Sequence, residues 1–345
     1  MLLTSPNPPW TMKLSECSPA EREALALLEQ RIGRTHLHQR LGLEGEHEVH
    51  VHRRGTHFLH IENWYSVHGL IRGALRLGGL HGRGQRNALA LRAVHNAVRL
   101  RGLPSGFEGY TLLHLSDLHL DASEDFLYQL VAQVQGLKYH ACVLTGDFRF
   151  RTFGAYQPTL NALARLRPHL GAQVYAVLGN HDTIRMVPGM EALGIRVLMN
   201  EAVRLQHQGD KVALVGIDDA HYVRTHNFPK YLEGVEAGAC AILLSHTPEP
   251  YRHAAHAGLR LMLCGHTHGG QICLPTGVPI ITDSDAPRSL ARGAWQHQQM
   301  LGYTSVGCGT SIVDVRLNCP PEITLHQLHQ LHRAPGLPQP GGRAQ

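Results

Sequence analysis

Five short polar motifs lie along the chain, and each of them follows an apolar stretch. The motifs are Asp117-Leu118-His119, Gly146-Asp147, Gly179-Asn180-His181-Asp182, Ser245-His246 and Gly265-His266-Thr267-His268. Together they supply carboxylates, imidazoles and one amide. Mixed oxygen and nitrogen donors of this kind suit Mn²⁺, Fe or Zn²⁺ better than Ca²⁺ or a structural zinc held by thiolates. The residue types therefore predict a metal site.

Three of the motifs contain a glycine directly before a candidate ligand, at Gly146, Gly179 and Gly265. Glycine has no Cβ atom, so it permits a sharp turn and a close approach of the backbone to a bound ion. We expect each glycine to bring the residue that follows it close to the metal.

The stretch before the first motif, Thr111–Leu115, is typical of a buried strand. Side chains two residues apart on an extended chain point to the same face, so Asp117 and His119 should leave the carboxyl end of this strand together. Open α/β sheets place their ligands at that end. The first strand therefore predicts the edge at which the site lies.

Predicted helices and strands alternate after residue 120. The helices are expected at 122–135 and 156–167, and the strands at 141–145, 173–178, 211–217, 239–244 and 259–263. This alternation is typical of a parallel sheet with right-handed crossovers. Two last strands are expected at 311–317 and 323–328, joined through Cys319-Pro320-Pro321. Residues 333–345 are rich in proline and glycine and are expected to be disordered.

A helix should open the ordered part of the chain, after a flexible, proline-rich segment at 1–17. Ser18 can cap this helix, Pro19 suits its first turn, and Glu21 stands three residues after the cap. Gly33 should end it.

The next segment, 34–61, is polar and rich in histidine, and alternation at 50–52 and 58–61 predicts short strands there. Its histidines could hold a metal ion or form the solvated edge of a strand. The histidines concerned are His47, His50 and His52.

Apolar residues recur at helical spacing between residues 62 and 80. They are Trp64, Val67, Ile71, Ala74 and Leu75, and the arginines around them are Arg72, Arg76, Arg83 and Arg86. An apolar face edged by arginines could lie on an anionic bilayer. The alternative is a helix that packs against its own domain.

The composition limits the kinds of protein that the chain can be. Its 345 residues are 43% hydrophobic and 17% charged, which allows one large domain with a full core or one domain plus an appendage. No apolar run reaches the roughly 18 residues of a membrane-spanning helix, and the amino-terminal residues lack the apolar core of a signal peptide. We therefore expect a cytoplasmic protein.

The seven cysteines agree with that location, because they are scattered and odd in number. Cys142 and Cys264 lie in apolar stretches and are expected in the core.

The formal net charge of +5 suits an anionic partner such as phosphate, a lipid headgroup or nucleic acid. No stretch of interleaved basic and aromatic residues favours nucleic acid.

In order and spacing, the five motifs resemble those of the calcineurin-like metallophosphoesterases. The resemblance covers roughly residues 98–328 and looks closest to bacterial, often membrane-associated members, through the segments 116–119, 266–271 and 321–323. It implies a two-sheet α/β sandwich at 98–332, preceded by an α/β extension at 18–97.

The resemblance also implies two divalent metal ions, which we expect to be Mn, with Fe or Zn as alternatives. One ion would be held by Asp117, His119, Asp147 and His268, and the other by Asp147, Asn180, His246 and His266. A water held by such ions loses its proton near pH ~7, which supplies a nucleophile. In the family, the position of His181 protonates the departing oxygen or steadies the transition state, and Asp182 could orient that ring.

The chain departs from the family after Gly146-Asp147, where many members have a second acid. Here Arg149 and Arg151 follow, and they could grip a second phosphate or a sugar acid, or be solvated. Asp218 and Asp219 end another strand and could support the site, although a structural turn suits them better.

The favoured function is hydrolysis of a phosphodiester or pyrophosphate bond by two metal ions. Similar proteins include enzymes of lipid A biosynthesis that cut UDP-2,3-diacylglucosamine, and a lipid-facing helix at 62–80 would suit such a substrate on the inner face of the membrane. The alternatives are a phosphoesterase acting on soluble nucleotides or nucleic acid, and a non-catalytic interaction module on the same fold.

Overall fold

The structure, a computed structural model, describes residues 18–54, 65–227, 230, 232–236 and 238–331, and for 47–54 and 65–68 it gives the backbone alone. The predictions for 1–17, 58–61, 333–345 and Trp64, and for the side chains of His47, His50, His52 and Val67, therefore lie outside the described residues.

The helices, in chain order, are α1 (Pro19–Ile32), α2 (Arg34–Arg54), α3 (Tyr65–Leu77), α4 (His81–Ala88), α5 (Glu124–Val134), α6 (Gln157–Leu166), α7 (Val187–Ala192) and α9 (Tyr251–His256). The strands of the first sheet are β1 (Arg92–Leu100), β2 (Thr111–Leu115), β3 (Ala141–Thr145), β4 (Val174–Val177), β5 (Arg196–Val197) and β12 (Glu322–Gln330). The strands of the second sheet are β6 (Glu201–His207), β7 (Asp210–Gly216), β8 (Ala241–Leu244), β9 (Leu261–Cys264), β10 (Gly293–His297) and β11 (Met300–Thr304). Short 3₁₀ turns lie at Ser105–Phe107, Arg167–His169, Ile184–Met186, His268–Gly270 and Arg288–Leu290.

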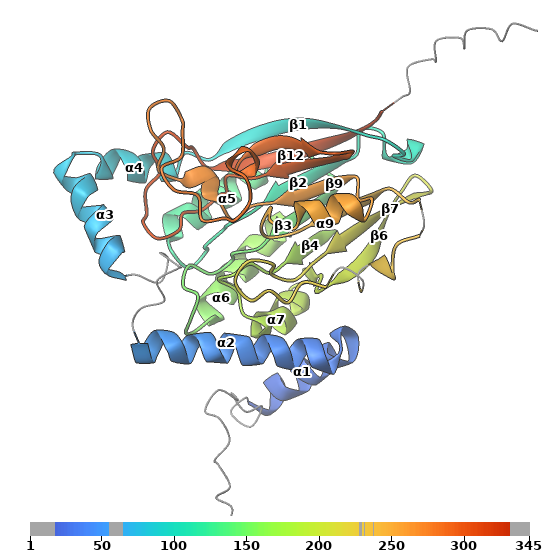
Figure 1. The fold of residues 1–345 in the computed structure, drawn as a ribbon, viewed down its shortest axis with the longest axis horizontal. Coiled ribbons are helices and arrows are strands. Elements are labelled where there is room, and N and C mark those ends of the chain that lie inside the picture. Colours follow the sequence, from blue (N-terminus) through green and yellow to red (C-terminus); the bar gives the residue numbers. More distant parts are fainter. Residues whose placement is uncertain (1–17, 55–64, 228–229, 231, 237, 332–345) are drawn as a thin grey trace, which may run out of the picture.

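Two six-stranded sheets make up the centre of the fold (Figure 1). The strand order is β1-β12-β2-β3-β4-β5 in the first sheet and β10-β11-β9-β8-β7-β6 in the second. β2, β3, β4 and β5 are parallel to one another, and so are β7, β8, β9 and β11. The predicted two-sheet α/β sandwich, with parallel strands in each half, is confirmed.

The side chains of the central strands alternate between two cores, as the two-residue period of a strand requires. Leu112 and Val143 face the second sheet and pack in a core with Leu214 and Ile242. The alternate residues of β2 and β3 pack on the other side with helices α5, α6 and α7. Cys142 and Cys264 are both fully buried, so their predicted place in the core is confirmed.

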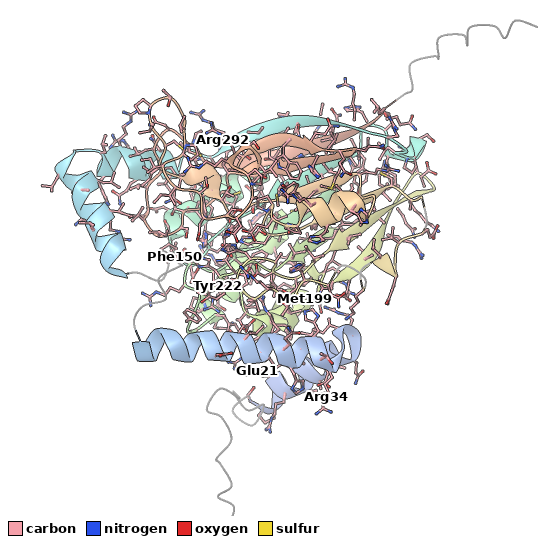
Figure 2. The ribbon with its side chains drawn as sticks, viewed as in Figure 1. Glu21, Arg34, Phe150, Met199, Tyr222 and Arg292 are labelled. Carbon is pink, nitrogen blue, oxygen red and sulfur yellow. The ribbon has the colours of Figure 1, made fainter. Side chains whose placement is uncertain are left out.

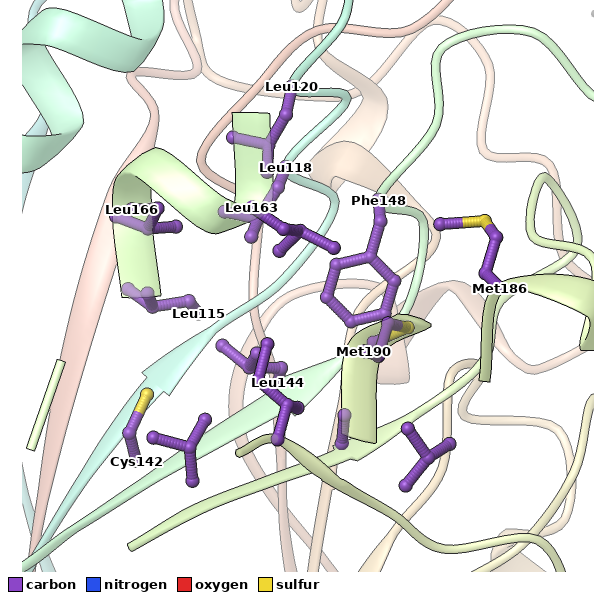
Figure 3. Packing of buried hydrophobic residues seen from close by; sticks show 14 of the residues in the cluster. Leu115, Leu118, Leu120, Cys142, Leu144, Phe148, Leu163, Leu166, Met186 and Met190 are labelled. Atoms are coloured by element: carbon purple, nitrogen blue, oxygen red, sulfur yellow. The ribbon is translucent and has the colours of Figure 1, made fainter. Parts of the chain in front are cut away.

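The helix-covered core also holds the loop that follows β3. Phe148, directly after Asp147, is fully buried and packs with Met186 and Met190, as Figure 3 shows. Leu118, within the first motif, belongs to the same core. Apolar neighbours of the polar motif residues thus fix the two loops in position.

The amino-terminal helix begins and ends where the sequence predicts. The hydroxyl of Ser18 accepts a hydrogen bond from the backbone N–H of Glu21 at 3.2 Å, and Gly33 ends the helix with a φ of 91°. α2 follows at once, so the short strand predicted at 50–52 is wrong. Its three-residue alternation lies at the end of a long helix, which buries Leu37 and partly buries Leu41 one turn later.

Two further details of the sequence-based organisation differ from the structure. The strand predicted at 311–317 is wrong: this segment bends, Ile312 has a left-handed φ of 64°, and only Leu317 forms an isolated bridge, with Ile272. β1 pairs with β12 along its whole length, so the chain enters the first sheet at Arg92, before the expected boundary at 97/98. The N-terminal part before it is helical in the residues described. Among these residues, no helix is long and apolar enough to span a bilayer.

Candidate metal centre

The five motifs meet where strands of both sheets end. Three motifs follow β2, β3 and β4 of the first sheet, and the other two follow β8 and β9 of the second. Parallel strands present their carboxyl ends at one edge of a sheet, so loops that are distant in sequence lie together there. The prediction that the motifs share one site can therefore be tested on distances.

Asp117, His119 and His268 form a first buried cluster. Each offers one ligand atom, and these atoms all lie within 4.8 Å of one another. The Nε2 atoms of His119 and His268 are 3.3 Å apart, and Nε2 of His268 lies 3.6 Å from Oδ1 of Asp117. Three donors that converge in this way leave a common point for a cation.

Asp147, His246 and His266 form a second buried cluster of the same kind. Nε2 of His246 lies 3.3 Å from Oδ2 of Asp147 and 3.2 Å from Nδ1 of His266. The amide oxygen of Asn180 is 2.9 Å from the same Nε2 atom. Asn180 therefore joins this cluster with a neutral oxygen.

Asp147 connects the two clusters. Its Oδ2 atom, close to His246 in the second cluster, also lies 3.9 Å from Nε2 of His119 in the first. A carboxylate in this position can contact cations on both sides. The structure thus brings together all seven residues expected to hold metal: Asp117, His119, Asp147, Asn180, His246, His266 and His268.

Backbone carbonyls orient two of the histidine rings. The Nδ1–H group of His119 donates to the carbonyl of Arg149 at 2.6 Å, and that of His246 donates to the carbonyl of Thr145 at 2.7 Å. In each ring the other nitrogen, Nε2, is left facing the cluster. Metal-binding histidines are usually held in this way, because the outer hydrogen bond fixes both the tautomer and the ring orientation.

Most of the seven site residues share one strained backbone conformation. Five of the seven residues have left-handed φ values, between 42° and 71°: Asp117, His119, Asp147, His266 and His268. Non-glycine residues rarely adopt this conformation, and such strain concentrates at functional sites. The strain is accommodated because the flanking residues Leu118 and Phe148 are locked in the core.

Close approach requires glycine at all three predicted positions, and at two of them the neighbour is a carboxylate of the site. A Cβ atom on Gly179 would lie 2.2 Å from Oδ1 of Asp147, and one on Gly265 would lie 2.3 Å from Oδ2 of Asp117. Contacts this short are impossible for a side chain. Gly179 therefore lets the loop after β4 reach the carboxylate after β3, and Gly265 lets a loop of the second sheet reach the carboxylate after β2 of the first.

The ionisation of the site suits a cation. Burial lowers the pKa of His119 to about 3 and keeps His266 and His268 neutral as well, which is the form that binds metal. Burial also lowers the pKa of His246, but the carboxylate of Asp147 more than offsets this and raises it to about 10. The same carboxylate charge would attract a divalent ion in place of that proton.

His181 lies at the edge of the clusters without belonging to either. Its Nδ1–H group donates to the carbonyl of Phe150 at 2.9 Å, and its Nε2 atom lies 3.9 Å from Oδ2 of Asp147. The ring therefore presents one nitrogen toward the centre. A histidine in this position can hold and release a proton beside a bound substrate.

Asp182 makes contacts other than the expected one. Its carboxylate accepts backbone N–H groups of Asp147, Phe148 and Gly179, at 2.8, 2.9 and 2.8 Å, and of Arg149 at 3.3 Å. The carbonyl of Phe150, and not this carboxylate, fixes the His181 ring. Asp182 thus holds the loop that carries the shared carboxylate.

Comparison with known proteins agrees with this geometry. Residues 110–270 match the family model described as calcineurin-like phosphoesterase. The uncharacterized metallophosphoesterase YkoQ of Bacillus subtilis (strain 168) is 33% identical over 240 residues, which cover 66% of this chain and 86% of that protein. This chain is a calcineurin-like phosphoesterase.

Two further relatives belong to the same group. The uncharacterized metallophosphoesterase YkuE of Bacillus subtilis (strain 168) is 28% identical over 271 residues, 75% of this chain and 93% of that protein. The phosphodiesterase YaeI of Escherichia coli (strain K12) is 29% identical over 233 residues, 64% of this chain and 82% of that protein. The chain is therefore a metal-dependent phosphoesterase, a hydrolase.

The structure separates the two arginines that follow the shared carboxylate. The side chain of Arg149 is buried and donates to the carbonyl of Gly154 at 3.4 Å, whereas Arg151 is exposed. Arg149 also lines a small cavity of about 50 Å³ together with Asn180 and Tyr222, which is labelled in Figure 2. Only Arg149 therefore lies against the residues of the phosphoesterase centre.

Asp218 and Asp219 serve the structure of the loop after β7. Asp219 accepts backbone N–H groups of His221, Tyr222 and Val223, which makes it the centre of a turn. The prediction of a structural turn is confirmed for this residue. Asp218 also accepts hydrogen bonds within this loop, from Asp219 and Thr225, and in addition it anchors α2.

α2 reaches the loop that carries His181, which the sequence did not reveal. The fully buried guanidinium of Arg40 donates to the carbonyl of Asp182 at 3.0 Å and lies 3.4 Å from Oδ1 of Asp218. One turn later, Glu44 accepts the backbone N–H of Ile184 at 2.9 Å and the hydroxyl of Thr183. The N-terminal extension thus braces the loop from outside.

We expect Arg40→Met to lower the free energy of unfolding by about 3–5 kcal/mol, since it removes the buried positive charge beside the carboxylates of Asp218 and Glu44. Burial raises the pKa of Asp218, but Arg40, His36 and Thr225 together outweigh burial and hold the pKa well below the usual range, so the stabilisation is present at neutral pH and is lost in acid. Urea denaturation at several pH values measures the effect. The exposed Arg34→Met on the same helix should change stability by less than about 0.5 kcal/mol. Equal free energies of unfolding for Arg40→Met and Arg34→Met at pH 7 would contradict the role of Arg40 in holding this loop.

A third group lies beside the second cluster, and sequence reasoning missed it. His221, His266 and Asp283 offer ligand atoms within 4.8 Å of one another, and Nδ1 of His221 lies 2.7 Å from Oε1 of Glu249. Burial lowers the pKa of His221, but the hydrogen bond to Glu249 and the negative charges of Glu249, Asp219 and Asp283 together outweigh burial and raise it to about 9. These residues surround the outer side of the His266 ring and can hold it in place.

A larger cavity opens next to the centre, with a volume of about 310 Å³. Its polar end is formed by side chains of the site, Asp147, His181, His266 and His268. Its apolar walls come from α3 and from two loops of the second half of the chain: Ile71, Ala74, Leu75, Ile272, Ile280, Ile281, Ile312 and Val313. The apolar stripe predicted at 62–80 therefore faces the site, through Ile71 and Leu75.

Proposed function

We propose that this enzyme hydrolyses a phosphodiester or pyrophosphate bond with two divalent metal ions. The observation that carries the proposal is the meeting of two clusters of histidine and aspartate at Asp147. One ion would be held by Asp117, His119, Asp147 and His268, and the other by Asp147, Asn180, His246 and His266. The converging donors, the carbonyl-oriented rings and the neutral His119, His266 and His268 all fit this assignment.

Mn²⁺ is the proposed ion, with Fe or Zn²⁺ as alternatives. Four of the seven donor residues are histidines, and Mg²⁺ prefers oxygen ligands. No thiolate contributes to the clusters in the part of the chain that the structure describes, which argues against a structural zinc of the cysteine type.

The chemistry is divided between the ions and the protein. Two such ions, when bound, supply a nucleophile at neutral pH and clamp the phosphoryl oxygens. His181 would donate a proton to the departing oxygen through Nε2, since its Nδ1–H group is committed to Phe150. Asp182 would keep the shared carboxylate in position through its hydrogen bonds to the backbone. Arg149 and, from the solvent side, Arg151 would bind a second phosphate or an acidic sugar of the substrate.

The substrate that fits this site carries an apolar group next to the scissile phosphate. The polar end of the 310 Å³ cavity is the metal centre, and the remaining walls are mostly aliphatic, with Gln271, Asp283 and Ser311 among them. Ligand sites of this type bury an apolar group against such walls and use a few polar groups to fix its orientation. A nucleotide-linked lipid such as UDP-2,3-diacylglucosamine, a precursor in lipid A biosynthesis, has these properties. The enzyme would then work in the cytoplasm, at the inner face of the membrane.

A substrate panel tests this proposal. We expect hydrolysis of bis(p-nitrophenyl) phosphate to exceed that of the monoester p-nitrophenyl phosphate. UDP-2,3-diacylglucosamine should have a kcat/KM at least about tenfold above that of UDP-glucosamine, which lacks the acyl chains. Replacing Leu75 by Ser should reduce this ratio, because Leu75 forms part of the apolar wall.

Each part of the proposal can fail separately in the panel. Hydrolysis of monoesters alone would contradict the diester or pyrophosphate assignment. Equal turnover of the acylated and unacylated nucleotides would contradict the apolar substrate and favour soluble nucleotides. Faster cleavage of single-stranded nucleic acid than of any small diester would instead favour the nuclease alternative.

A further inference from the structure

We propose that α3 and the loop 274–281 form a surface that docks onto an anionic lipid bilayer, with the mouth of the active-site cavity in that surface. The inference deepens the proposed function and rests on it for the nature of the substrate. The binding to lipid can be measured without any substrate. We call these two segments together the docking surface.

Large apolar side chains are exposed in this region far more than elsewhere. Of the ten large hydrophobic residues that are exposed in the described part of the chain, seven lie on α3, directly after it or in the loop 274–281. The seven are Leu70 (73% exposed), Leu77 (93%), Leu80 (40%), Leu274 (50%), Val278 (48%), Ile280 (52%) and Ile281 (52%). Contiguous exposed apolar surface of this kind marks an interaction site.

The two segments are neighbours, although about 200 residues separate them in the sequence. Ile71 and Leu75 of α3 line the same cavity as Ile280 and Ile281 of the loop. On the helix, Leu70 and Leu77 lie two turns apart, next to the stripe formed by Ile71 and Leu75. The apolar exterior therefore continues directly into the apolar walls of the active-site cavity.

The docking surface is fixed to the rest of the enzyme through α4. A Cβ atom on Gly84 would lie 2.7 Å from Cβ of Val315, so only glycine allows this close packing. The carbonyl of Gly84 accepts the backbone N–H of Arg316 at 2.9 Å, and Gln85 donates to Asp314 at 2.7 Å. Figure 1 shows α3 and α4 together at one side of the molecule, with α3 standing outside the sheets. α3 thus projects from the rest of the enzyme while α4 holds it in place.

Arginines flank the apolar residues. Arg72 and Arg76 lie on α3, and Arg292 lies beside the loop, because a Cβ atom on Gly277 would be 3.5 Å from its Nη2 atom. Arg83 and Arg86 add two exposed basic residues on α4. Two acids lie close by: Asp314, which is 3.5 Å from Arg72 and accepts from Gln85, and Asp283 in the cavity wall.

This combination favours an anionic bilayer over a protein partner. A helix with a broad apolar face and basic residues at its edges lies in the plane of a membrane surface, where arginine side chains reach the headgroups. The basic residues would be attracted by anionic lipids within a Debye length of the surface. Docking in this way would let an acylated substrate pass from the bilayer into the cavity along apolar surface.

The experiment is sedimentation of the full-length enzyme with vesicles. We expect binding to vesicles of phosphatidylcholine mixed with phosphatidylglycerol, and at least about tenfold weaker binding to phosphatidylcholine alone. Raising the salt from about 0.15 M to about 1 M shortens the Debye length from about 8 Å to about 3 Å, so binding should weaken. It should persist in part, because the contribution of the leucines is apolar.

Two sets of variants separate charge from apolar contact. Replacing Arg72, Arg76 and Arg292 by Gln should weaken binding to anionic vesicles by about 10²-fold, since each basic residue near the surface contributes about fivefold. Replacing Leu70 and Leu77 by Ser should weaken it about tenfold or more at both salt concentrations. Neither set contains a residue that lines the cavity.

Matched controls come from the same chain. Arg99, Arg101 and Arg204 are exposed arginines outside the docking surface, and β1 carries the first of them away from the α4 side (Figure 1). Leu27 and Tyr128, 63% and 72% exposed, lie on α1 and α5. Changing the arginines to Gln, or the two apolar residues to Ser, should leave vesicle binding unchanged.

The outcomes distinguish this inference from the proposed function. The proposed docking surface is contradicted if the enzyme binds no vesicles at any salt concentration. It is also contradicted if the control variants lose as much vesicle binding as the variants of the docking surface. In either case hydrolysis of bis(p-nitrophenyl) phosphate is measured separately in solution. If that activity is absent while vesicle binding follows the variants as described, the docking surface stands and the proposed reaction fails.

Discussion

An enzyme with Asp147→Asn is expected to lose at least about 10²-fold in kcat/KM on bis(p-nitrophenyl) phosphate and to lose bound metal at the same time. Asp147 is the residue that touches both clusters, so the change removes one negative charge from each ion site. Changing a residue that only supports a metal ligand costs roughly 10–100-fold. A shared ligand should cost more than that.

Metal analysis and steady-state kinetics on the same preparation check this expectation. Asp125→Asn, at an exposed carboxylate in the first turn of α5, is the matched control and should retain both metal and activity. The side chain of Asp147 also accepts the backbone N–H of His181 at 2.9 Å, which an amide oxygen can replace. A folded Asp147→Asn enzyme that keeps full metal content and full activity would contradict the shared-ligand role.

The second large effect is expected from His181→Ala, which should lower kcat by roughly 10²–10⁴-fold, the usual contribution of general acid catalysis. The metal content should not change, because His181 belongs to neither cluster and is held by the carbonyl of Phe150. The loss should shrink for substrates with good leaving groups such as p-nitrophenolate, since these depart without a proton.

The leaving-group series is the internal control for that variant. A merely structural role would lower the rate by the same factor for every substrate, whereas a proton donor affects poor leaving groups most. If His181→Ala empties one of the metal sites, or if its rate loss is the same across the series, the residue is not the general acid.

The central strands and their parallel arrangement could be predicted because several levels of the sequence agree. Thr111–Leu115 and Ala141–Thr145 are short, apolar and β-branched or aliphatic, and both strands form over the predicted residues. The polar residues after each strand can only lie at the edge of a parallel sheet. The glycines of the motifs also follow from local chemistry, as the 2.2 Å approach to Gly179 illustrates.

Features that depend on tertiary packing could not be predicted in the same way. The alternation at 50–52 covers too few residues to distinguish a strand from the end of a helix. The segment is helical because it continues α2, which packs Leu37 and Leu41 against the core. The apolar segment 311–317 looks like a strand, yet it forms a bent loop whose residues Ile312 and Val313 line the cavity. Arg40 gives no signal of its own, because its partner Asp218 lies far along the chain.

The role of α3 also depends on tertiary packing, which its sequence pattern does not report. Its amphipathic pattern predicts a helix with an apolar face, and α3 covers most of that range. The pattern does not say that this face is shared between the cavity and solvent. Only the position of Leu75 in the cavity wall, with Leu77 exposed two residues further along the helix, reveals both uses.

The most direct test of the account is a metal titration of the chelator-stripped enzyme, followed by hydrolysis of bis(p-nitrophenyl) phosphate. The stripped enzyme should be inactive, and activity should return as Mn²⁺ is added, reaching its limit at two equivalents per chain. Mg²⁺ should restore activity no better than Mn²⁺, because four of the donor residues are histidines. Full activity in the stripped enzyme, or full recovery at one equivalent, would contradict a centre built from two ions around Asp147.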